Sequence, residues 1–311
     1  MSEAVERKID EYIKGRRYRQ INRVLISRDN EIMADCCYNG FNKDSKNEIL
    51  SVAKSIMSVC AGIVLDKGLI GSLDEPVYKY IREFSEGREP FHRMITIRHL
   101  LTMTSGIYWN GGVHYHCPMM KQLRSSGNWI SYIADCAVAD IPGTKYNYKE
   151  WDVILLGKLL DIVCGDMYDF INEKIFKPLG IEGSRWHKSP CGVYYSVGDG
   201  GDDNETKFKL TAADMLKIGQ LFLNGGTYRE KQIISQNYIN QAVTPLKDNP
   251  NYGFLWWIWG EEYGCRGYGG QSITVIPKEN AVIITQATPT DRGNRYFDVV
   301  EYCKELLKDT Y

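Results

Sequence analysis

The sequence has no excess of charge of either sign, no long apolar run and no CxxC motif. Its 38 basic and 39 acidic residues leave a net charge of -1, so it lacks the electrostatic signature of a protein that binds nucleic acid or an anionic membrane surface. The longest apolar stretch, residues 56–65, is too short to cross a bilayer. Residues 1–20 are charged and amphipathic, unlike a secretory signal, and we therefore expect a cytoplasmic protein.

The nine cysteines are odd in number and scattered, which favours reduced thiols packed as small apolar groups. His114, His116 and Cys117 offer donor atoms at close spacing, but no second ligand cluster accompanies them at a zinc-site spacing. The acidic run at 198–205 lacks the ligand pattern of a calcium loop. We expect no metal and no organic cofactor.

The composition indicates a globular protein, because 43% of the residues are hydrophobic and 12% are aromatic. The order of predicted strands and helices indicates the α/β (α+β) class. Helical spacing over residues 4–14 is followed by two predicted strands that flank a turn at 28–30. Apolar patterns predict further strands near the C-terminus, with residues 253–259 forming the first of them. The other predicted strands are 271–276 and 281–286, a terminal helix is predicted at 295–308, and the helices between the two ends are predicted at 97–103, 129–137, 151–163, 169–176, 212–223 and 236–242.

Strands near both ends and helices between them predict an antiparallel sheet flanked by N- and C-terminal helices, with a large, mostly helical subdomain inserted. We expect a single domain over residues 10–306. Its α/β subdomain is placed at residues 1–70 and 245–311, and its helical subdomain at residues 71–244. A ligand is expected in the cleft between them.

Ser51 and Lys54 stand three residues apart at the start of an apolar helix, so their side chains lie on one face and can meet. Burial and the positive end of the helix dipole would lower the pKa of Lys54 and make it a base for the serine. Taken alone, the SxxK pattern is weak, and a solvated lysine beside a helix-capping serine is the alternative.

Ordered segments along most of the chain resemble the serine beta-lactamase and penicillin-binding-protein superfamily, in particular its class C and esterase-like branch. The similar segments are EILS (48–51) leading into SVAKS, DKGLIGSLDEPV (66–77), ITIRHLLTMTSGI (95–107), PGTKYNY (142–148), IFKPLGI (175–181), AADMLKIGQLFLNGG (212–226), YGFLWW (252–257) and GYGGQSITVIP (267–277). The resemblance implies a beta-lactamase/transpeptidase-like fold, with Ser51 as the acylating nucleophile and Lys54 as its partner.

The resemblance also implies a tyrosine in a Y-x-N loop, which places Tyr148 in the active site but puts Glu150 where the family has asparagine. A carboxylate directed at Lys54 would raise the pKa of the lysine and shift the role of base to Tyr148. The alternative is that Glu150 points into solvent.

The third active-site motif of the family is Lys-Thr-Gly or His-x-Gly. The corresponding stretch of this chain is residues 265–271, in which Tyr268 stands in the position of the lysine or histidine. Gln271 is then expected to contribute a backbone N–H to an oxyanion hole completed by the N–H of Ser51. A plain tight turn entering a strand is the alternative for the glycines at 269 and 270. Two interpretations are open for Tyr108, Trp109 and His114, which either line the cleft or pack within their own loop. Of the three, Trp109 is a candidate substrate-binding residue. The tryptophans at 256, 257 and 259 are assigned to the core.

These residues predict a serine hydrolase that cleaves a small ester or amide through an acyl-enzyme. The missing cation and Glu150 predict poor hydrolysis of beta-lactams, and D-Ala-D-Ala peptidase activity is disfavoured for a protein expected in the cytoplasm. A binding or sensing module that acylates slowly, or not at all, is the alternative. We expect a small-molecule substrate, no nucleic-acid or membrane partner, and make no prediction of oligomeric state.

Overall fold

The structure is a computed structural model that describes residues 2–85, 90–111, 117–183, 185–186, 188–195, 208–290 and 296–308. The main sheet has six antiparallel strands in the order β2-β1-β10-β9-β8-β7. Its strands are β1 (Ile21–Arg28), β2 (Glu31–Cys37), β7 (Trp257–Trp259), β8 (Glu262–Gly267), β9 (Gln271–Ile276) and β10 (Ala281–Ala287). Two small ribbons pair β3 (Asn47–Glu48) with β4 (Lys209–Leu210) and β5 (Thr227–Tyr228) with β6 (Lys231–Gln232).

Helices make up most of the remaining described chain. The α-helices are α1 (Ser2–Arg16), α2 (Val52–Asp66), α3 (Pro90–Met94), α4 (Ile97–Leu101), α5 (Pro118–Ser125), α6 (Trp129–Asp135), α7 (Glu150–Cys164), α8 (Met167–Ile171), α9 (Lys177–Leu179), α10 (Ala212–Leu223), α11 (Gln236–Ala242) and α12 (Phe297–Lys308). Short 3-10 helices are η1 (Val77–Lys79), η2 (Arg82–Phe84) and η4 (Pro277–Glu279), and η3 (Asn172–Phe176) is a π-helix. None of the helices in the described ranges is long and apolar enough to cross a membrane.

The sheet is covered on both faces, because successive side chains of a strand point to opposite sides. Val24 and Ile26 of β1 pack with α1 and α12, whereas Leu25 belongs to the larger core formed with α2, α7 and α10. The same alternation holds in β10, where Ile283 faces the terminal helices and Ile284 faces the larger core. The predicted sheet with flanking N- and C-terminal helices is therefore confirmed.

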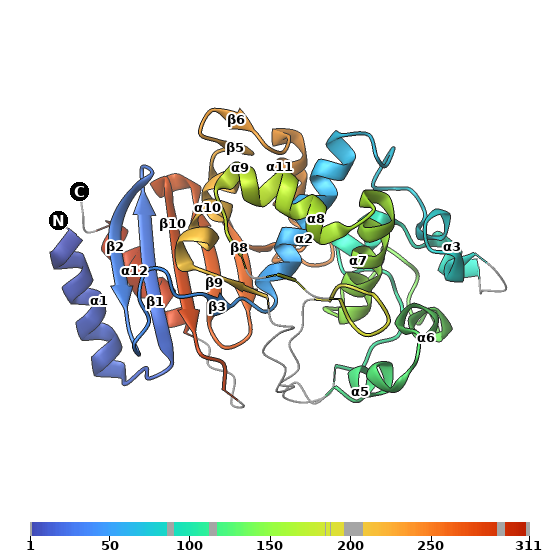
Figure 1. Cartoon of the computed structure of the whole chain (residues 1–311), viewed down its shortest axis with the longest axis horizontal. Helices are drawn as coiled ribbons and strands as arrows, with labels where there is room; N and C mark the ends of the chain where they lie inside the picture. The colour runs from blue at the N-terminus through green and yellow to red at the C-terminus, as the bar shows by residue number, and fades with distance from the viewer. Residues whose placement is uncertain are drawn as a thin grey trace.

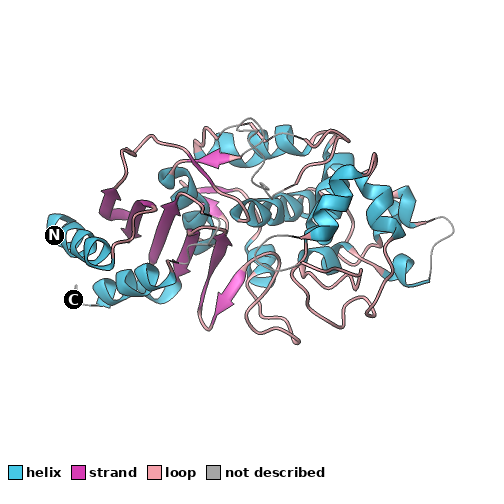
Figure 2. Ribbon diagram, turned by 90° about the horizontal axis from the view of Figure 1, so that it is seen from below, coloured by secondary structure: helices cyan, strands magenta, loops and turns pink. Residues whose placement is uncertain are grey.

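Helix α2 runs between the sheet and the helical part of the molecule (Figure 1). It packs against β8 and β9 on one side and against α7 and α11 on the other. Residues 52–64 of the helix are all buried. Figure 2 shows the same arrangement from below, with α1 and α12 together on the side of the sheet that faces away from these helices. The N-terminus of α2 is consequently held at a fixed place between two packed layers.

The predicted elements near the N-terminus are confirmed, and their turn is tighter than expected. Asp29 and Asn30 both have positive φ angles, of 52° and 63°, which is the backbone of a two-residue hairpin turn that suits the right-handed twist of its strands. The predicted helices 212–223 and 236–242 match α10 and α11.

One prediction near the C-terminus is wrong, and one strand was not predicted. Residues 253–256 are not strand, because Leu255 has a φ of +60° and the N–H of Gly253 donates to the carbonyl of Trp256, so β7 begins only at Trp257. The glycine-rich stretch before residue 268 is a full strand, β8, that the sequence did not predict. The helix predicted over 169–176 begins at Met167 and continues as η3.

Candidate active site

Ser51 stands at the N-terminus of α2, directly after a strained residue. Leu50 has a φ of +50°, a left-handed conformation that is unfavourable for a residue with a branched side chain and is characteristic of functional sites. The side chain of Ser51 makes no capping hydrogen bond to the helix. The alternative of a helix-capping serine is therefore wrong, and its hydroxyl is available to other partners.

The Ser51 hydroxyl meets Lys54, as the spacing predicts. The Nζ atom of Lys54 donates to Oγ of Ser51 over 2.9 Å. The lysine side chain is almost fully buried, with a relative exposure of 1%. The alternative of a solvated lysine is also wrong.

Glu150, at the first position of α7, points inward and pairs with the same ammonium. Its Oε1 atom lies 2.9 Å from Nζ of Lys54, and the carboxylate is largely buried. The alternative that Glu150 points into solvent is wrong. Lys54 is thus shared between the serine hydroxyl and a carboxylate, an arrangement that an asparagine at position 150 would not produce.

The pKa of Lys54 is raised above its ordinary value. Burial acts to lower the pKa, but the Glu150 carboxylate and the Tyr148 phenol act in the opposite direction and outweigh it. The expectation that burial and the helix dipole would leave Lys54 uncharged is therefore wrong. The lysine is an ammonium at neutral pH, and it donates to Ser51 rather than accepting its proton.

Tyr148 lies just before α7, and its ring centroid is 5.3 Å from Nζ of Lys54. The ring of Trp257 stacks beside it at 5.8 Å with an interplanar angle of 23°, and Tyr252 approaches it edge-on at 6.3 Å. Trp257 is predicted to lie in the core. Trp257 is only partly buried. Its neighbour Trp256 is fully buried against Phe222, and because successive side chains of a strand point to opposite sides, this alternation could have placed Trp257 at the site.

Residues 268–270, which belong to the counterpart of the family's third motif, form the turn between β8 and β9. Gly269 and Gly270 have φ angles of +83° and +105°, and an added Cβ atom at them would lie 2.8 Å from Pro289 and 2.7 Å from Tyr296. These glycines therefore permit a tight, closely packed turn at the start of β9. The hairpin borders the segment before Ser51, because a Cβ atom on Gly267 would lie 2.4 Å from the carbonyl oxygen of Ile49.

The side chains of Tyr268 and Gln271 are engaged in the scaffold. The Tyr268 hydroxyl donates to the carbonyl of Thr290 over 2.7 Å. The Gln271 amide donates to the carbonyl of Ala287 over 2.6 Å and accepts from Asn47 over 2.9 Å. The role expected of Gln271 therefore depends on its backbone N–H alone.

Trp109 is partly buried and packs edge-on against Trp151 of α7, with ring centroids 4.6 Å apart. Tyr108 beside it is 50% exposed. His114, His116 and the acidic run at 198–205 lie outside the described residues. Within the described ranges, no group of three His, Cys, Asp or Glu side chains comes together as a metal site, and all nine cysteines are free thiols.

Comparisons with known proteins show what the whole chain is similar to. A family model described as beta-lactamase matches residues 6–298. A 6-aminohexanoate-dimer hydrolase of Paenarthrobacter ureafaciens is 21% identical over 300 residues, which cover 88% of this chain and 74% of that protein.

Two solved structures share the fold. The octameric penicillin-binding protein homologue from Pyrococcus abyssi superimposes with a TM-score of 0.72 at 20% identity, covering 98% of this chain and 77% of that one. EstCE1, a hydrolase with promiscuous acyltransferase activity, superimposes with a TM-score of 0.71 at 15% identity, covering 91% and 92%.

Proposed function

The chain belongs to the beta-lactamase family, and on that premise we propose that it is a serine hydrolase that cleaves a small ester or amide through an acyl-enzyme on Ser51. The observation that carries the proposal is the position of Lys54, whose Nζ atom lies 2.9 Å from both Oγ of Ser51 and Oε1 of Glu150. A buried ammonium at that point fixes the serine hydroxyl and places positive charge where an alkoxide would form.

In the proposed mechanism Tyr148 takes the proton of Ser51, because Lys54 remains charged. A phenolate at Tyr148 is the form that can take this proton, and the Nζ atom of Lys54 lies 5.3 Å from the centroid of its ring. The serine alkoxide then attacks the substrate carbonyl, and the backbone N–H groups of Ser51 and Gln271 stabilise the oxyanion by about 3 kcal/mol each. Tyr148 returns the proton to the leaving group, and water releases the acyl group.

A neutral substrate suits this site better than a carboxylate. Tyr268 stands where the family has a cation, and its hydroxyl is already hydrogen-bonded to Thr290. Lys54 is neutralised by Glu150. Beta-lactams and D-Ala-D-Ala peptides carry a carboxylate that a cation in this position would bind, and we propose that such compounds are poor substrates.

Substitution of Ser51 tests the proposal. We expect Ser51→Ala to lower the rate of p-nitrophenyl acetate hydrolysis by about a thousandfold or more, because the nucleophile is lost. Ser125→Ala, on the exposed end of α5, is the matched control and should leave the rate unchanged. Equal rates for Ser51→Ala and the parent protein would refute the proposed function.

A binding or sensing module is the second candidate, and the Lys54–Glu150 ion pair is the observation that favours it. Charge on Lys54 removes the base that the family's SxxK element supplies, which would slow deacylation. Intact-mass spectrometry after addition of a p-nitrophenyl ester separates the two candidates. Transient labelling of Ser51 with recovery of the free protein indicates an enzyme, whereas permanent labelling or none indicates a sensor.

A further inference from the structure

Tyr148 and Glu150 reach the active site because the residue between them has an extended backbone. Lys149 has φ and ψ angles of -149° and 154°, and successive side chains of an extended segment point to opposite sides. Tyr148 and Glu150 therefore face Lys54, and Lys149 points the other way, where its side chain is 1% exposed.

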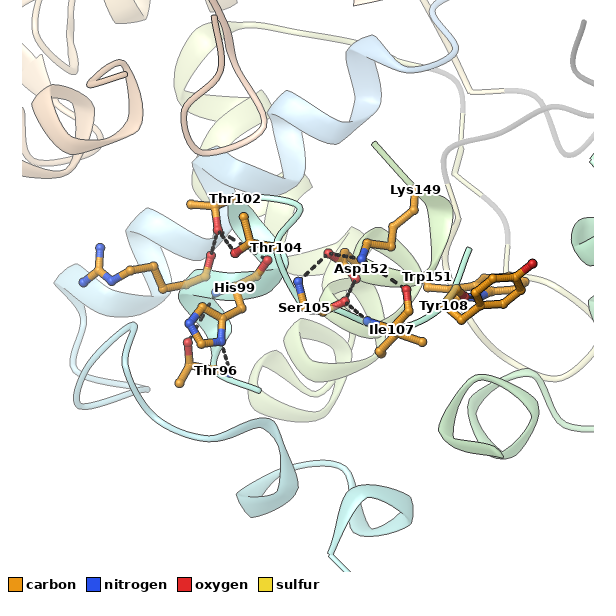
Figure 3. A network of polar contacts seen from close by, with 11 residues as sticks. Thr96, His99, Thr102, Thr104, Ser105, Ile107, Tyr108, Lys149, Trp151 and Asp152 are labelled. Atoms are coloured by element: carbon orange, nitrogen blue, oxygen red, sulfur yellow. Dashed lines mark hydrogen bonds and ion pairs between the residues drawn. The ribbon is translucent and has the colours of Figure 1, made fainter. Parts of the chain in front are cut away.

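Lys149 enters a buried polar network at the N-terminus of α7 (Figure 3). Its Nζ atom donates to the carbonyl of Ile107 over 3.3 Å and lies 3.8 Å from Oδ2 of Asp152. Asp152 is fully buried and accepts hydrogen bonds from both the hydroxyl and the backbone N–H of Ser105. Neither charge reaches solvent, so each depends on the other and on residues 105–107.

Residues 103–108 thus form an anchoring loop for the segment that carries Tyr148. The N–H of Asn147 donates to the carbonyl of Met103 over 3.0 Å, and the indole N–H of Trp151 donates to the carbonyl of Tyr108 over 3.1 Å. The loop is itself fixed at Gly106, where a φ of +75° and the carbonyl of Asp140, 1.9 Å from an added Cβ atom, admit only glycine. Contacts on both sides of Tyr148 therefore connect it to one rigid loop.

We propose that Ser105, Lys149 and Asp152 are positioning residues that hold residues 147–151 against the anchoring loop, so that Tyr148 and Glu150 face Lys54. A buried ion pair is a poor source of stability, since the desolvation of both charges offsets their attraction. The pair instead serves to fix the position of the segment, because a shift of about 1 Å in a catalytic group can lower the rate about a hundredfold. The inference rests on the proposed function for its consequence, but its geometric content can be tested separately.

The network should make the activity sensitive to acid. Burial raises the pKa of Asp152 to about 6, against the opposing effects of Lys149 and Ser105, and protonation leaves the Lys149 charge buried without its counterion. The titratable groups that interact electrostatically with Asp152 are Lys149 and Tyr252. Comparison of the wild-type pH profile with that of Asp152→Asn therefore tests whether Asp152 causes the decline in activity in acid.

The test compares kcat, KM and the pH profile for p-nitrophenyl acetate among matched variants. We expect Asp152→Asn and Lys149→Met to lower kcat by about tenfold to a hundredfold with KM within twofold. Asp152→Asn should also lose the decline in kcat near pH 6. Ser105→Ala should lower kcat and Ser105→Thr, which keeps the hydroxyl, should restore it. Asp214→Asn is the control, because Asp214 also occupies the third position of a helix and pairs with a lysine three residues later, Lys217.

A second readout does not depend on activity. With 3-fluorotyrosine at position 148, the ¹⁹F resonance should shift or broaden in Asp152→Asn and Ser105→Ala and stay in place in Asp214→Asn. An unmoved resonance, or an unchanged kcat and pH profile in Asp152→Asn, would overturn the inference. If the wild-type protein shows no hydrolysis that depends on Ser51, the proposed function fails, and the ¹⁹F comparison still decides whether the network positions Tyr148.

Discussion

One carboxylate changes the electrostatics of the candidate active site. Glu150 occupies a position where an amide would leave the charge on Lys54 unbalanced, and here it forms a buried ion pair with that lysine. Removing one member of a buried pair leaves the other charged in a poorly solvated place. The identity of residue 150 therefore affects both the stability of the protein and the charge on its lysine.

Glu150→Gln is predicted to lower the pKa of Lys54, because burial, the largest influence on it, would then act without an opposing carboxylate. The free energy of unfolding should fall by about 3 to 5 kcal/mol at neutral pH. Selective ¹⁵N NMR of the lysine Nζ atom measures the pKa, and urea unfolding measures the stability. Glu173→Gln, which removes an exposed pair with Lys177, should change neither, and an unmoved Lys54 pKa would contradict the prediction.

Asp152 is predicted to make the folded state less stable as the pH rises from about 4 to 6. Burial raises its pKa to about 6 in the folded protein, from an unfolded value of 3.8, so the folded state binds the proton more tightly. The stabilisation this provides is complete below pH 3.8 and is lost as the pH passes through 6, a change of about 3 kcal/mol.

Urea unfolding of the wild-type protein and Asp152→Asn at several pH values checks this. The stability of the wild type relative to the variant should decline from pH 4 to pH 7. Two parallel stability curves would show that Asp152 titrates alike in the folded and unfolded states.

At the level of elements, α2 is held by close contacts that leave no room for a methyl group. An added Cβ atom at Gly62 would lie 2.5 Å from side-chain atoms of both Ile234 and Tyr238. Tyr238 is itself fixed by its hydroxyl, which donates to the carbonyl of Ser58 over 2.8 Å. The helix that begins beside Ser51 is therefore seated tightly on α11.

Gly62→Ala is predicted to lower the free energy of unfolding by about 1 to 3 kcal/mol, because overpacking outweighs the better helix propensity of alanine. Gly15→Ala in α1 is the matched control, since no atom lies within 4 Å of an added Cβ atom there. It should stabilise the protein by up to about 1 kcal/mol. Urea unfolding of the two variants gives the comparison, and equal effects would show that the contacts at Gly62 yield easily.

Elements with local signals could be predicted from the sequence, and elements fixed by distant partners could not. Thr211 and Ser235 cap α10 and α11 through their side chains, so those helices begin where the sequence indicates. The tryptophan-rich stretch before β7 has the composition of a strand. Its conformation is instead set at Leu255, whose N–H donates to Leu101 and whose carbonyl accepts from Ser55.

In the candidate site too, contacts within one helix could be predicted from the sequence, and contacts between distant elements could not. The contact between Ser51 and Lys54 follows from a spacing of three residues in one helix and was predictable. The direction of Glu150 depends on packing between α7 and α2, and so does the charge on Lys54 that results from it. The side chain of Trp257 reaches Tyr148 from a strand more than a hundred residues away, a contact that no local pattern records.

At the scale of the whole molecule, the two ends of the chain complete one layer. The rings of Tyr12 in α1 and Tyr302 in α12 stack 4.0 Å apart, and the Tyr12 hydroxyl donates to Asp298. Both helices cover the same face of the sheet. Helix α2, which begins beside Ser51, packs in the core on the opposite face, so the terminal helices support the candidate active site through the sheet rather than by contact.

The strand order has a consequence for synthesis on the ribosome. Val24 in the second element of the chain pairs with Thr285 in β10, so β1 and β2 emerge long before the strand that completes their sheet. Until then they form a two-stranded ribbon with one exposed apolar face that includes Val24, Ile26 and Ala34, and such ribbons are marginal alone and prone to aggregate. The nascent protein is therefore expected to need protection by chaperones until β8, β9 and β10 have left the exit tunnel.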